Sequence, residues 1–308
     1  LRLLKKELIN YAHKVIIIDE GNLSIREKNK QLLNGLTYKF YGPRERKEFF
    51  RHEFGSHYRK YLEVIPQKCH AETSFGFLIS YEEKPDFVLE LDDDVHPIAG
   101  KNILAEHRKN LFEKGGETVG SKCKWFNTLG NLKLKSGRFF PRGHPYMPNA
   151  RQNDYYWIYE GDTCVLNMGL WSGDPDLDSI TLLSHGGIDG RGNIRSEELL
   201  KEKVVIDKGT YFAVCSMNTS FLPKIIPAFY QLYMNYMGID RFDDIWSGIF
   251  LKKICDTVND KICLGRPLVL HRKRHRYVFN DLKKELDGII MNEILWKIVD
   301  EANMDGNT

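Results

Sequence analysis

The stretch Phe87-Val88-Leu89-Glu90-Leu91-Asp92-Asp93-Asp94 carries most of the evidence for the fold of this 308-residue chain. Residues 87–91 have the length and apolar content of a buried strand. Pro85 separates this strand from a predicted helix over residues 71–81, and another helix is predicted over residues 103–113. A strand placed between two helices is typical of an α/β fold.

A similar unit begins the chain. Residues 1–12 have apolar residues at helical spacing, and the β-branched run Val15-Ile16-Ile17-Ile18 predicts a buried parallel strand. Asp19 and Glu20 follow at its carboxyl end, which is the edge where open α/β sheets bind ligands. A nucleotide-binding α/β domain usually opens with a strand before its first helix. We therefore expect residues, and with them a first strand, to be missing from the amino end.

The remainder of the chain predicts helices and strands around a loop-rich middle. Residues 115–210 are rich in Gly, Pro, Asn and Asp and are predicted to form loops around a site. Asn280 or Asp281 is the predicted cap of the last helix. The predicted elements are a strand over residues 155–159, helices over 220–236 and 244–258, a strand over 267–270, and a helix from 282 to about 302.

Composition excludes several classes of protein. With 45 basic and 42 acidic residues, the net charge is only +3, so we expect no nucleic-acid partner. Six cysteines without a Cys-x-x-Cys pair, and no secretory segment, predict reduced thiols in a cytoplasmic protein. No apolar run approaches the roughly 20 residues that a membrane span needs. The one strongly basic run, His271-Arg272-Lys273-Arg274-His275-Arg276, suits a phosphate group.

Three adjacent carboxylates, Asp92, Asp93 and Asp94, repel one another at the end of an apolar strand. A divalent cation would neutralise them, and oxygen ligands suit Mg²⁺ or Mn²⁺, which bridge diphosphate oxygens. Strand alternation predicts Asp92 and Asp94 on one face and Asp93 on the other. The alternative is a solvated acidic turn. His271, after the predicted strand over residues 267–270, is a candidate third ligand, with a structural histidine as the alternative.

Two further segments place charged residues where a substrate could reach them. Asp243 and Asp244 open a predicted helix that also carries Trp246. Either these aspartates favour the helix macrodipole, or one of them reaches a sugar against which Trp246 stacks. Arg142 lies in a loop between two prolines. It is either a surface residue or an arginine held for contact with phosphate or carboxylate.

A series of motifs occurs in a fixed order from about residue 13 to residue 293. The motifs are Val15-Ile16-Ile17-Ile18-Asp19-Glu20-Gly21, Leu91-Asp92-Asp93-Asp94, Phe126-Asn127-Thr128-Leu129, Arg142-Gly143-His144-Pro145-Tyr146, Gly169-Leu170-Trp171, Pro175-Asp176-Leu177-Asp178, Cys215-Ser216-Met217-Asn218, Arg241-Phe242-Asp243-Asp244-Ile245-Trp246-Ser247-Gly248, Lys253-Ile254-Cys255-Asp256, His271-Arg272-Lys273 and residues 280–285. Together they resemble the reversibly glycosylated polypeptides, the UDP-arabinopyranose mutase family. The chain departs from plant members in residues 151–160 and 272–276 and in an inserted Asp281, so the resemblance leaves the sugar and the base open.

The resemblance implies a GT-A glycosyltransferase-like fold. This would be a single α/β domain over residues 1–308, with a mixed sheet flanked by helices. Residues 1–114 would form the nucleotide-binding half, and residues 115–308 the sugar and acceptor half with the C-terminal helix. The resemblance also implies a cytoplasmic nucleotide-sugar enzyme that uses Mn²⁺ or Mg²⁺ and carries a reversibly attached sugar on Arg142.

The predicted function is therefore a metal-dependent mutase that interconverts the pyranose and furanose forms of an arabinose-like UDP-sugar. Arg142 would be catalytic, with Asp243 or Asp244 accepting its proton. The predicted metal ligands are Asp92, Asp94 and His271, and the predicted nucleotide- and sugar-binding residues are Asp19, Glu20, Asp93, Trp171, Asp176, Asp178, Asn218, Trp246 and Lys273. Two alternatives stay open, a glycosyltransferase with a separate acceptor and a non-catalytic nucleotide-sugar-binding subunit. Homo- or hetero-oligomerisation also stays open.

Overall fold

In the part of the chain that the structure describes, ten strands form the central sheet. They are β3 (Val88–Leu91), β4 (Val95–Pro97), β5 (Glu117–Ser121), β6 (Leu132–Leu134), β7 (Tyr155–Ile158), β8 (Leu166–Gly173), β9 (Ser196–Leu199), β10 (Lys203–Ile206), β11 (Asn218–Phe221) and β12 (Ile262–His271). The order is β3-β11-β8-β12-β10-β5-β7, with β4 added to β12 and with β9 pairing both β6 and β8. The computed structural model describes residues 2–11, 14–134, 137–190, 196–273 and 275–304.

Both parallel and antiparallel pairs occur in this sheet. β12 runs parallel to β8, with Ile262 opposite Leu166 and His271 opposite Gly173, and the register shifts between Gly265 and Val269. β10 is parallel to β5 and antiparallel to β12, and β11 is antiparallel to both β3 and β8. The long β8 and β12 therefore end side by side, which sets the position of the candidate site.

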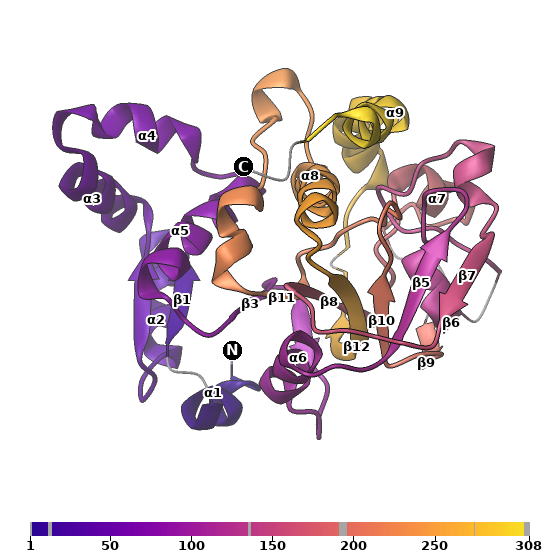
Figure 1. The fold of residues 1–308 in the computed structure, drawn as a ribbon. Coiled ribbons are helices and arrows are strands. Elements are labelled where there is room, and N and C mark those ends of the chain that lie inside the picture. Colours follow the sequence, from indigo (N-terminus) through magenta and orange to yellow (C-terminus); the bar gives the residue numbers. More distant parts are fainter. Residues whose placement is uncertain (1, 12–13, 135–136, 191–195, 274, 305–308) are drawn as a thin grey trace.

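Helices cover both faces of the sheet. Figure 1 shows α8 and α9 on one side of the sheet and α6 on the other. The α-helices are α1 (Lys5–Tyr11), α2 (Leu23–Leu32), α3 (Pro43–Phe54), α4 (Tyr58–Val64), α5 (Thr73–Glu83), α6 (Ile103–Phe112), α7 (Ser179–Ser184), α8 (Asp243–Val258) and α9 (Val278–Glu301). The short 3₁₀ helices are η1 (Gly55–His57), η2 (His70–Glu72), η3 (Thr128–Asn131), η4 (Pro148–Arg151), η5 (Pro223–Ala228) and η6 (Asn235–Met237).

A small second sheet lies beside the first. β1 (Val15–Ile18) and β2 (Tyr38–Tyr41) pair in parallel, and α5 packs against β1. This part, indigo to violet in Figure 1, has its own aromatic cluster around Phe50 and Phe75. The predicted parallel strand is confirmed, but the prediction of full burial is wrong. Its four residues are half-buried, because only a two-stranded sheet and a few helices surround them.

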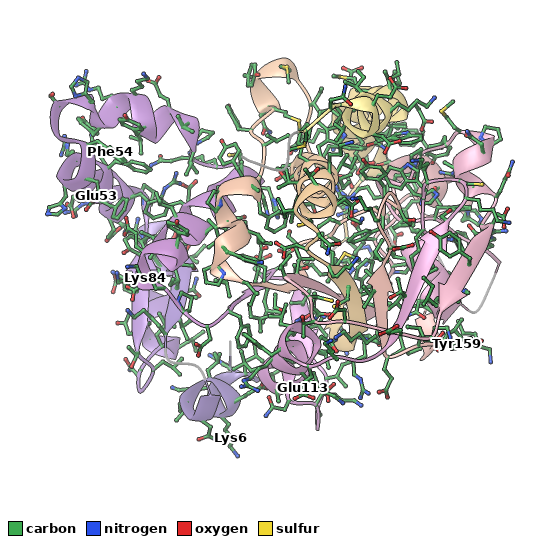
Figure 2. The ribbon with its side chains drawn as sticks, in the orientation of Figure 1. Lys6, Glu53, Phe54, Lys84, Glu113 and Tyr159 are labelled. Atoms are coloured by element: carbon green, nitrogen blue, oxygen red, sulfur yellow. The ribbon has the colours of Figure 1, made fainter. Side chains whose placement is uncertain are left out.

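The main core lies between the central sheet and its helices, and side chains fill that space (Figure 2). Trp171, Met168 and Phe221 are among its fully buried members. A second cluster, which includes Trp125 and Trp246, joins α8 to α9. Tyr159, at the outer end of β7, projects away from the molecule and is 87% exposed.

Two predictions of secondary structure are wrong. Residues 220–236 do not form a helix: β11 occupies their start, and Pro223 and Pro227 limit the rest of this segment to short 3₁₀ turns. The loop-rich character predicted for residues 115–210 is confirmed, since most of the described residues there lie outside helices and strands, although the strands β5 to β10 run through this region. The last helix begins at Val278, earlier than predicted. Neither Asn280 nor Asp281 is its N-cap, and Asp281 instead forms ion pairs with Arg241 and Arg276.

The mixed sheet with helices on both faces confirms the predicted α/β fold class and is consistent with a GT-A-like arrangement. β3 and β4 pair with β11 and β12, so the sheet crosses the predicted boundary at residue 114. Within the described ranges, no helix combines the length and apolar character that crossing a bilayer requires.

Candidate active site

Asp94 and His271 meet at the ends of paired strands. β4 runs antiparallel to β12 with Val95 opposite His271, so the residue before Val95 lies beside the imidazole. Asp94 Oδ2 is 3.6 Å from His271 Nε2. Burial opposes ionisation of Asp94, but the hydrogen bond and charge of His271 outweigh it and lower the Asp94 pKa below its ordinary value.

His271 is held in one orientation by the neighbouring strand end. Its Nδ1 lies 2.7 Å from the backbone carbonyl oxygen of Asp174, which can only accept, so Nδ1 donates and Nε2 faces Asp94. Gly173 allows this approach. Its φ is +88°, and a Cβ there would lie 2.5 Å from the His271 carbonyl oxygen. Metal-binding histidines adopt this arrangement, with the second ring nitrogen bonded to a carbonyl or carboxylate.

Asp92 and Asp93 differ in their surroundings. The three aspartates form the turn between β3 and β4 and do not continue the strand. Strand alternation therefore does not apply to them; Asp93 is exposed, whereas Asp92 and Asp94 are half-buried. Asp94 and His271 are already in contact. Yet no three His, Cys, Asp or Glu side chains of the described residues are arranged as a ready-made metal cage. The donor types and the orientation of His271 fit a divalent cation.

Arg142 lies between two carboxylates. Its Nη2 is 3.0 Å from Asp176 Oδ2 and 3.8 Å from Asp244 Oδ2, and its Nε donates to Asp176 at 3.1 Å. Nη1 donates to the carbonyl of Arg241. Burial disfavours the charged guanidinium, but Asp176 and Asp244 together raise the Arg142 pKa well above its ordinary value.

The loop that carries Arg142 is packed onto α8 and α9. Gly143 has φ +87°, and a Cβ there would lie 2.6 Å from a side-chain carbon of Ile245. Asn292 Nδ2 donates to the Gly143 carbonyl at 2.8 Å. Glu293 accepts from the backbone N–H of Tyr146 and of Met147. Arg142 is therefore fixed by residues distant in sequence, not by the prolines alone.

Asp176 and Asp244 lie near the same guanidinium but have different electrostatic environments. Burial would raise the Asp176 pKa, but Arg142 and then Lys273 outweigh burial and lower it. Burial dominates at Asp244 and raises its pKa to about 6, against the opposing effect of Arg142. Of the two, Asp244 is the better proton acceptor near neutral pH.

His70 is a member of the site that the sequence did not indicate. It lies in η2, and its Nδ1 is 2.6 Å from Asp243 Oδ2 while its Nε2 is 4.0 Å from Asp92 Oδ1. Burial would lower the His70 pKa, but the Asp243 carboxylate and then Asp92 raise it well above its ordinary value. Asp243 therefore faces His70, whereas Asp244 faces Arg142. No periodicity or strand end marks His70 in the sequence, so only the fold could reveal it.

Lys273 completes the cationic side of the site. It is buried, and its Nζ lies 3.4 Å from Asp176 Oδ1. Burial lowers the Lys273 pKa to about 8, although Asp176 acts in the opposite direction. Of the other basic residues in this run, Arg276 pairs with Asp281 and Arg274 lies outside the described residues.

Four predicted binding residues are not brought into this cluster. Trp171 is 1% exposed in the main core, and Trp246 donates its Nε1–H to Asn292 between α8 and α9. Asn218 bonds His107 and the Leu170 carbonyl inside the protein. Asp178 caps α7 and accepts the hydroxyl of Tyr146. Their contacts here are those of structural residues.

Asp19 and Glu20 lie in the smaller sheet, each with its own partners. Asp19 accepts from the Gly21 N–H at 2.8 Å and from Asn29 Nδ2 at 2.7 Å. Glu20 pairs with the fully buried Arg46 and accepts from the Lys68 N–H. Because both carboxylates already have protein partners, we expect a structural role for them; the base-binding role predicted from the sequence is the alternative that a measurement of UDP affinity decides.

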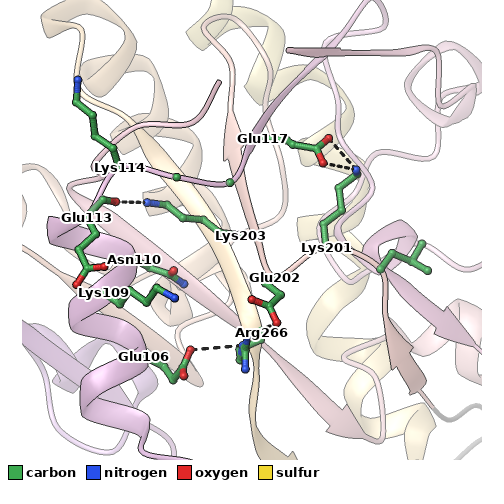
Figure 3. A pocket seen from close by; sticks show the side chains of 13 residues that line it. Glu106, Lys109, Asn110, Glu113, Lys114, Glu117, Lys201, Glu202, Lys203 and Arg266 are labelled. Atoms are coloured by element: carbon green, nitrogen blue, oxygen red, sulfur yellow. Dashed lines mark hydrogen bonds and ion pairs between the residues drawn. The ribbon is translucent and has the colours of Figure 1, made fainter. Parts of the chain in front are cut away.

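A polar pocket lies elsewhere, between the end of α6 and the start of β5 and β10 (Figure 3). Its charges largely neutralise one another. Lys201 Nζ is 2.7 Å from Glu117, and Arg266 pairs with Glu106 and Glu202. We assign no ligand to this pocket.

The ends of β3, β8 and β12, together with η2, the start of α8 and the Arg142 loop, thus gather carboxylates, two histidines, a lysine and an arginine. This arrangement defines an α/β protein with a polar, charge-paired site. The model of the family described as "Reversibly glycosylated polypeptide" matches residues 4–306, and the chain belongs to this family. UDP-arabinopyranose mutase 1 of Arabidopsis thaliana is 29% identical over 91% of this chain and 70% of its own length. Probable UDP-arabinopyranose mutase 1 of Solanum tuberosum is 30% identical over 91% of this chain and 68% of its length. Probable UDP-arabinopyranose mutase 2 of Solanum tuberosum is 32% identical over 71% of this chain and 54% of its length.

Proposed function

We propose that this protein is a mutase that interconverts the pyranose and furanose forms of an arabinose-like UDP-sugar. The names of its relatives support the reaction. The observation that carries the proposal is the position of Arg142, held between Asp176 and Asp244 near the strand ends. UDP as the nucleotide and a cytoplasmic location are part of the same proposal.

The reaction needs a bond to be broken and remade at the anomeric carbon. In the covalent version, an Arg142 nitrogen bonds to that carbon while the C–O bond to the diphosphate breaks, and its electron pair leaves with UDP. Asp244 accepts the proton that Arg142 loses, because its raised pKa of about 6 makes it the stronger base of the two neighbours.

Ring opening then changes the ring size. The ring C–O bond breaks as a C=N iminium bond to Arg142 forms, and the ring oxygen takes up a proton and becomes a hydroxyl. A different sugar hydroxyl then adds to the same carbon and gives up its proton, while the C=N bond returns to a single C–N bond. A diphosphate oxygen of UDP displaces Arg142, which recovers its proton from Asp244. The obstacle is the raised pKa of Arg142, since the charged guanidinium is no nucleophile. In the rival electrostatic version, Arg142 stabilises charge on the departing diphosphate without bonding to carbon.

A divalent cation is part of the proposal. Asp94 and His271 would hold Mn²⁺ or Mg²⁺ together with Asp92, and Asp93 would lie toward the nucleotide. When bound, the ion supplies a positive charge for the diphosphate oxygens. Lys273, beside Asp176, adds a second cation on the same side, and His70 orients Asp243 and faces Asp92.

Incubation with UDP-sugars and Mn²⁺, without an acceptor, tests the function. We expect pyranose and furanose forms to interconvert, measured by chromatography and NMR of the UDP-sugar, and we expect Arg142→Ala to abolish the conversion. Slow hydrolysis, or transfer only after an acceptor is added, would indicate the glycosyltransferase. Binding by calorimetry without any conversion would indicate the non-catalytic subunit.

A further inference from the structure

Arg241 lies just before α8 and holds Arg142 through its main chain. The carbonyl oxygen of Arg241 accepts a hydrogen bond from Arg142 Nη1. The backbone of Arg241 is left-handed, with φ +66°, which is uncommon for residues other than glycine. Such a conformation persists only where surrounding contacts fix it. The contacts of Arg241 therefore decide where its carbonyl oxygen points.

Helix α9 fixes both the side chain and the main chain at this position. Arg241 Nε donates to Glu285 Oε1 at 2.5 Å, and Arg241 Nη1 lies 3.9 Å from Asp281 Oδ1. Glu285 is fully buried, so its charge-assisted bond to the guanidinium is shielded from water. The backbone N–H of Asp240 donates to the carbonyl oxygen of Lys284 at 3.2 Å. The segment that ends at Arg241 is thus attached to α9 at two points.

Glu285 also fixes the segment that carries the other acceptor of Arg142. Its Oε2 accepts the backbone N–H of Ser179 at 2.8 Å and the Ser179 hydroxyl at 2.6 Å. Ser179 follows Asp176 closely in the chain, at the start of α7. Asp176 in turn accepts from the Arg142 backbone N–H at 2.9 Å and from its Nε at 3.1 Å. One buried carboxylate therefore connects the two segments that accept hydrogen bonds from Arg142.

The three nitrogens of the Arg142 guanidinium have different partners. Nε donates to Asp176, and Nη1 donates to the Arg241 carbonyl. Nη2 lies 3.0 Å from Asp176 Oδ2 and 3.8 Å from Asp244 Oδ2. A guanidinium is planar, so contacts that hold Nε and Nη1 also set the direction of Nη2. Nη2 is therefore the nitrogen that is kept beside Asp244.

We infer that Arg241 and Glu285 are positioning residues for Arg142, which together hold its guanidinium so that Nη2 faces Asp244. This inference rests on the proposed function and adds the reacting atom to it. In the covalent version, Nη2 bonds to the anomeric carbon, the C–O bond to the diphosphate breaks with its electron pair leaving on UDP, and the Nη2 proton goes to Asp244. Arg241 and Glu285 act through Arg142 and need no contact with the sugar.

NMR of the protein labelled with ¹⁵N-arginine tests the placement of Arg142 without any reaction. In the wild type we expect two separate Nη signals for Arg142, identified by their loss in Arg142→Lys, because Nη1 and Nη2 have different fixed partners. Arg241→Gln leaves Glu285 bonded to Ser179, and Glu285→Gln keeps the size of the side chain but removes its charge. Both variants should merge the two signals into one averaged signal. Signals that stay separate in both variants, or a single averaged signal in the wild type, overturn the inference.

Turnover with a UDP-sugar and Mn²⁺ tests the consequence for the reaction. We expect Arg241→Gln and Glu285→Gln each to lower kcat at least about tenfold and to change KM less than about threefold, because only the reacting group is misplaced. A variant with unchanged kcat overturns the inference. A raised KM with unchanged kcat also overturns it, since that result assigns the residue to substrate binding.

Asp256→Asn is the matched control for Glu285→Gln. Asp256 is also a buried carboxylate that pairs with a basic side chain, Lys252, and accepts a backbone N–H, that of Gly209. It lies roughly 18 Å from Asp244 along the axis of α8. Asp256→Asn should lower the melting temperature, as Glu285→Gln does, but should leave kcat and the Arg142 signals unchanged. Equal losses of kcat in the two variants would overturn the inference, because they would follow from lost stability alone.

Failure of the proposed function would give a different result. The wild type would then show two Nη signals that Arg241→Gln merges, yet it would convert no UDP-sugar. That result supports the placement of Arg142 by Arg241 and Glu285 and contradicts the mutase reaction.

Discussion

Two strand ends in this protein are acidic, and they differ in what surrounds them. Asp19 and Glu20 follow β1, and Asp92 to Asp94 follow β3. Asp19 and Glu20 are occupied by their own neighbourhood: Gly21, Asn29, Arg46 and Lys68 all donate to them. Asp92 and Asp94 face histidines that lie in η2 and at the end of β12.

An acidic strand end is therefore not a site by itself. Among the described residues, β1 pairs with no strand other than β2, whereas the turn after β3 lies close to the ends of β8 and β12. The ends of β3, β8 and β12 bring Asp94, His271 and Lys273 to one place, and Arg142 joins them through its ion pair with Asp176, which follows β8. Substitutions near Asp92 to Asp94 should therefore lower turnover strongly, whereas substitutions at Asp19 and Glu20 should affect turnover little.

The largest effect is expected at Arg142. Arg142→Ala should lower turnover at least about a thousandfold, because it removes the group held beside the reacting centre. It should also destabilise the fold by about 3–5 kcal/mol, since Asp176 and Asp244 lose their shared buried cation. Thermal unfolding and turnover at a temperature where the variant is folded separate the two effects.

Arg142→Lys then distinguishes the two versions of the mechanism. If the bond to carbon forms, this variant should be nearly inactive, and only the wild type should gain the mass of a sugar by intact-mass spectrometry. An electrostatic role predicts a measurable fraction of the rate and no adduct on either protein. Full activity in Arg142→Ala would contradict both versions.

The next effect compares the two acidic strand ends directly. Asp94→Asn should reduce Mn²⁺-dependent turnover about a hundredfold, because a cation at His271 would lose a charged ligand. The matched change Asp19→Asn should alter turnover by no more than about twofold. If the wild type keeps its turnover in EDTA and the purified protein contains no metal, Asp94 is not a metal ligand and the two strand ends do not differ in this respect.

A smaller effect should appear in the pH profile. If Asp244 is the base, kcat/KM should rise as the pH passes through about 6, the raised pKa of this carboxyl. Asp244→Asn should lower kcat/KM about a hundredfold at pH 8, less at lower pH, and should remove the rise of kcat/KM near pH 6. If Asp244→Asn keeps the rise of kcat/KM near pH 6, that rise belongs to the titration of another group.

The same raised pKa affects stability. The protonated form of Asp244 stabilises the fold at acid pH, and this contribution is lost as the pH rises through about 6.

The smallest effect on activity is expected at Glu20. Glu20→Gln should destabilise the protein by about 2–3 kcal/mol, because the fully buried Arg46 loses its nearest carboxylate. UDP affinity by calorimetry should change less than about twofold, also in Glu20→Gln/Asp19→Asn. A loss of UDP affinity with unchanged denaturant unfolding would instead support the base-binding role predicted from the sequence, and both acidic strand ends would then be binding sites.

Local sequence patterns were enough to predict several elements and the residue types of the site. Apolar runs and turn residues identified the strands at residues 15–18 and 88–91 and the helix α6, because these patterns depend only on neighbours along the chain. The same reasoning selected Asp94, His271 and Arg142, which the structure places in one charged region.

Which of these residues meet depends on the folded chain and could not be read from the sequence. The β4–β12 register sets Asp94 against His271, and the fold of the N-terminal part carries His70 to Asp243. Trp171 and Trp246 are also buried in the core, because removing their large apolar area from water stabilises the fold. The physical reason is that periodicity reports which side of an element is buried, whereas strand pairing and side-chain packing between distant segments decide what each side faces.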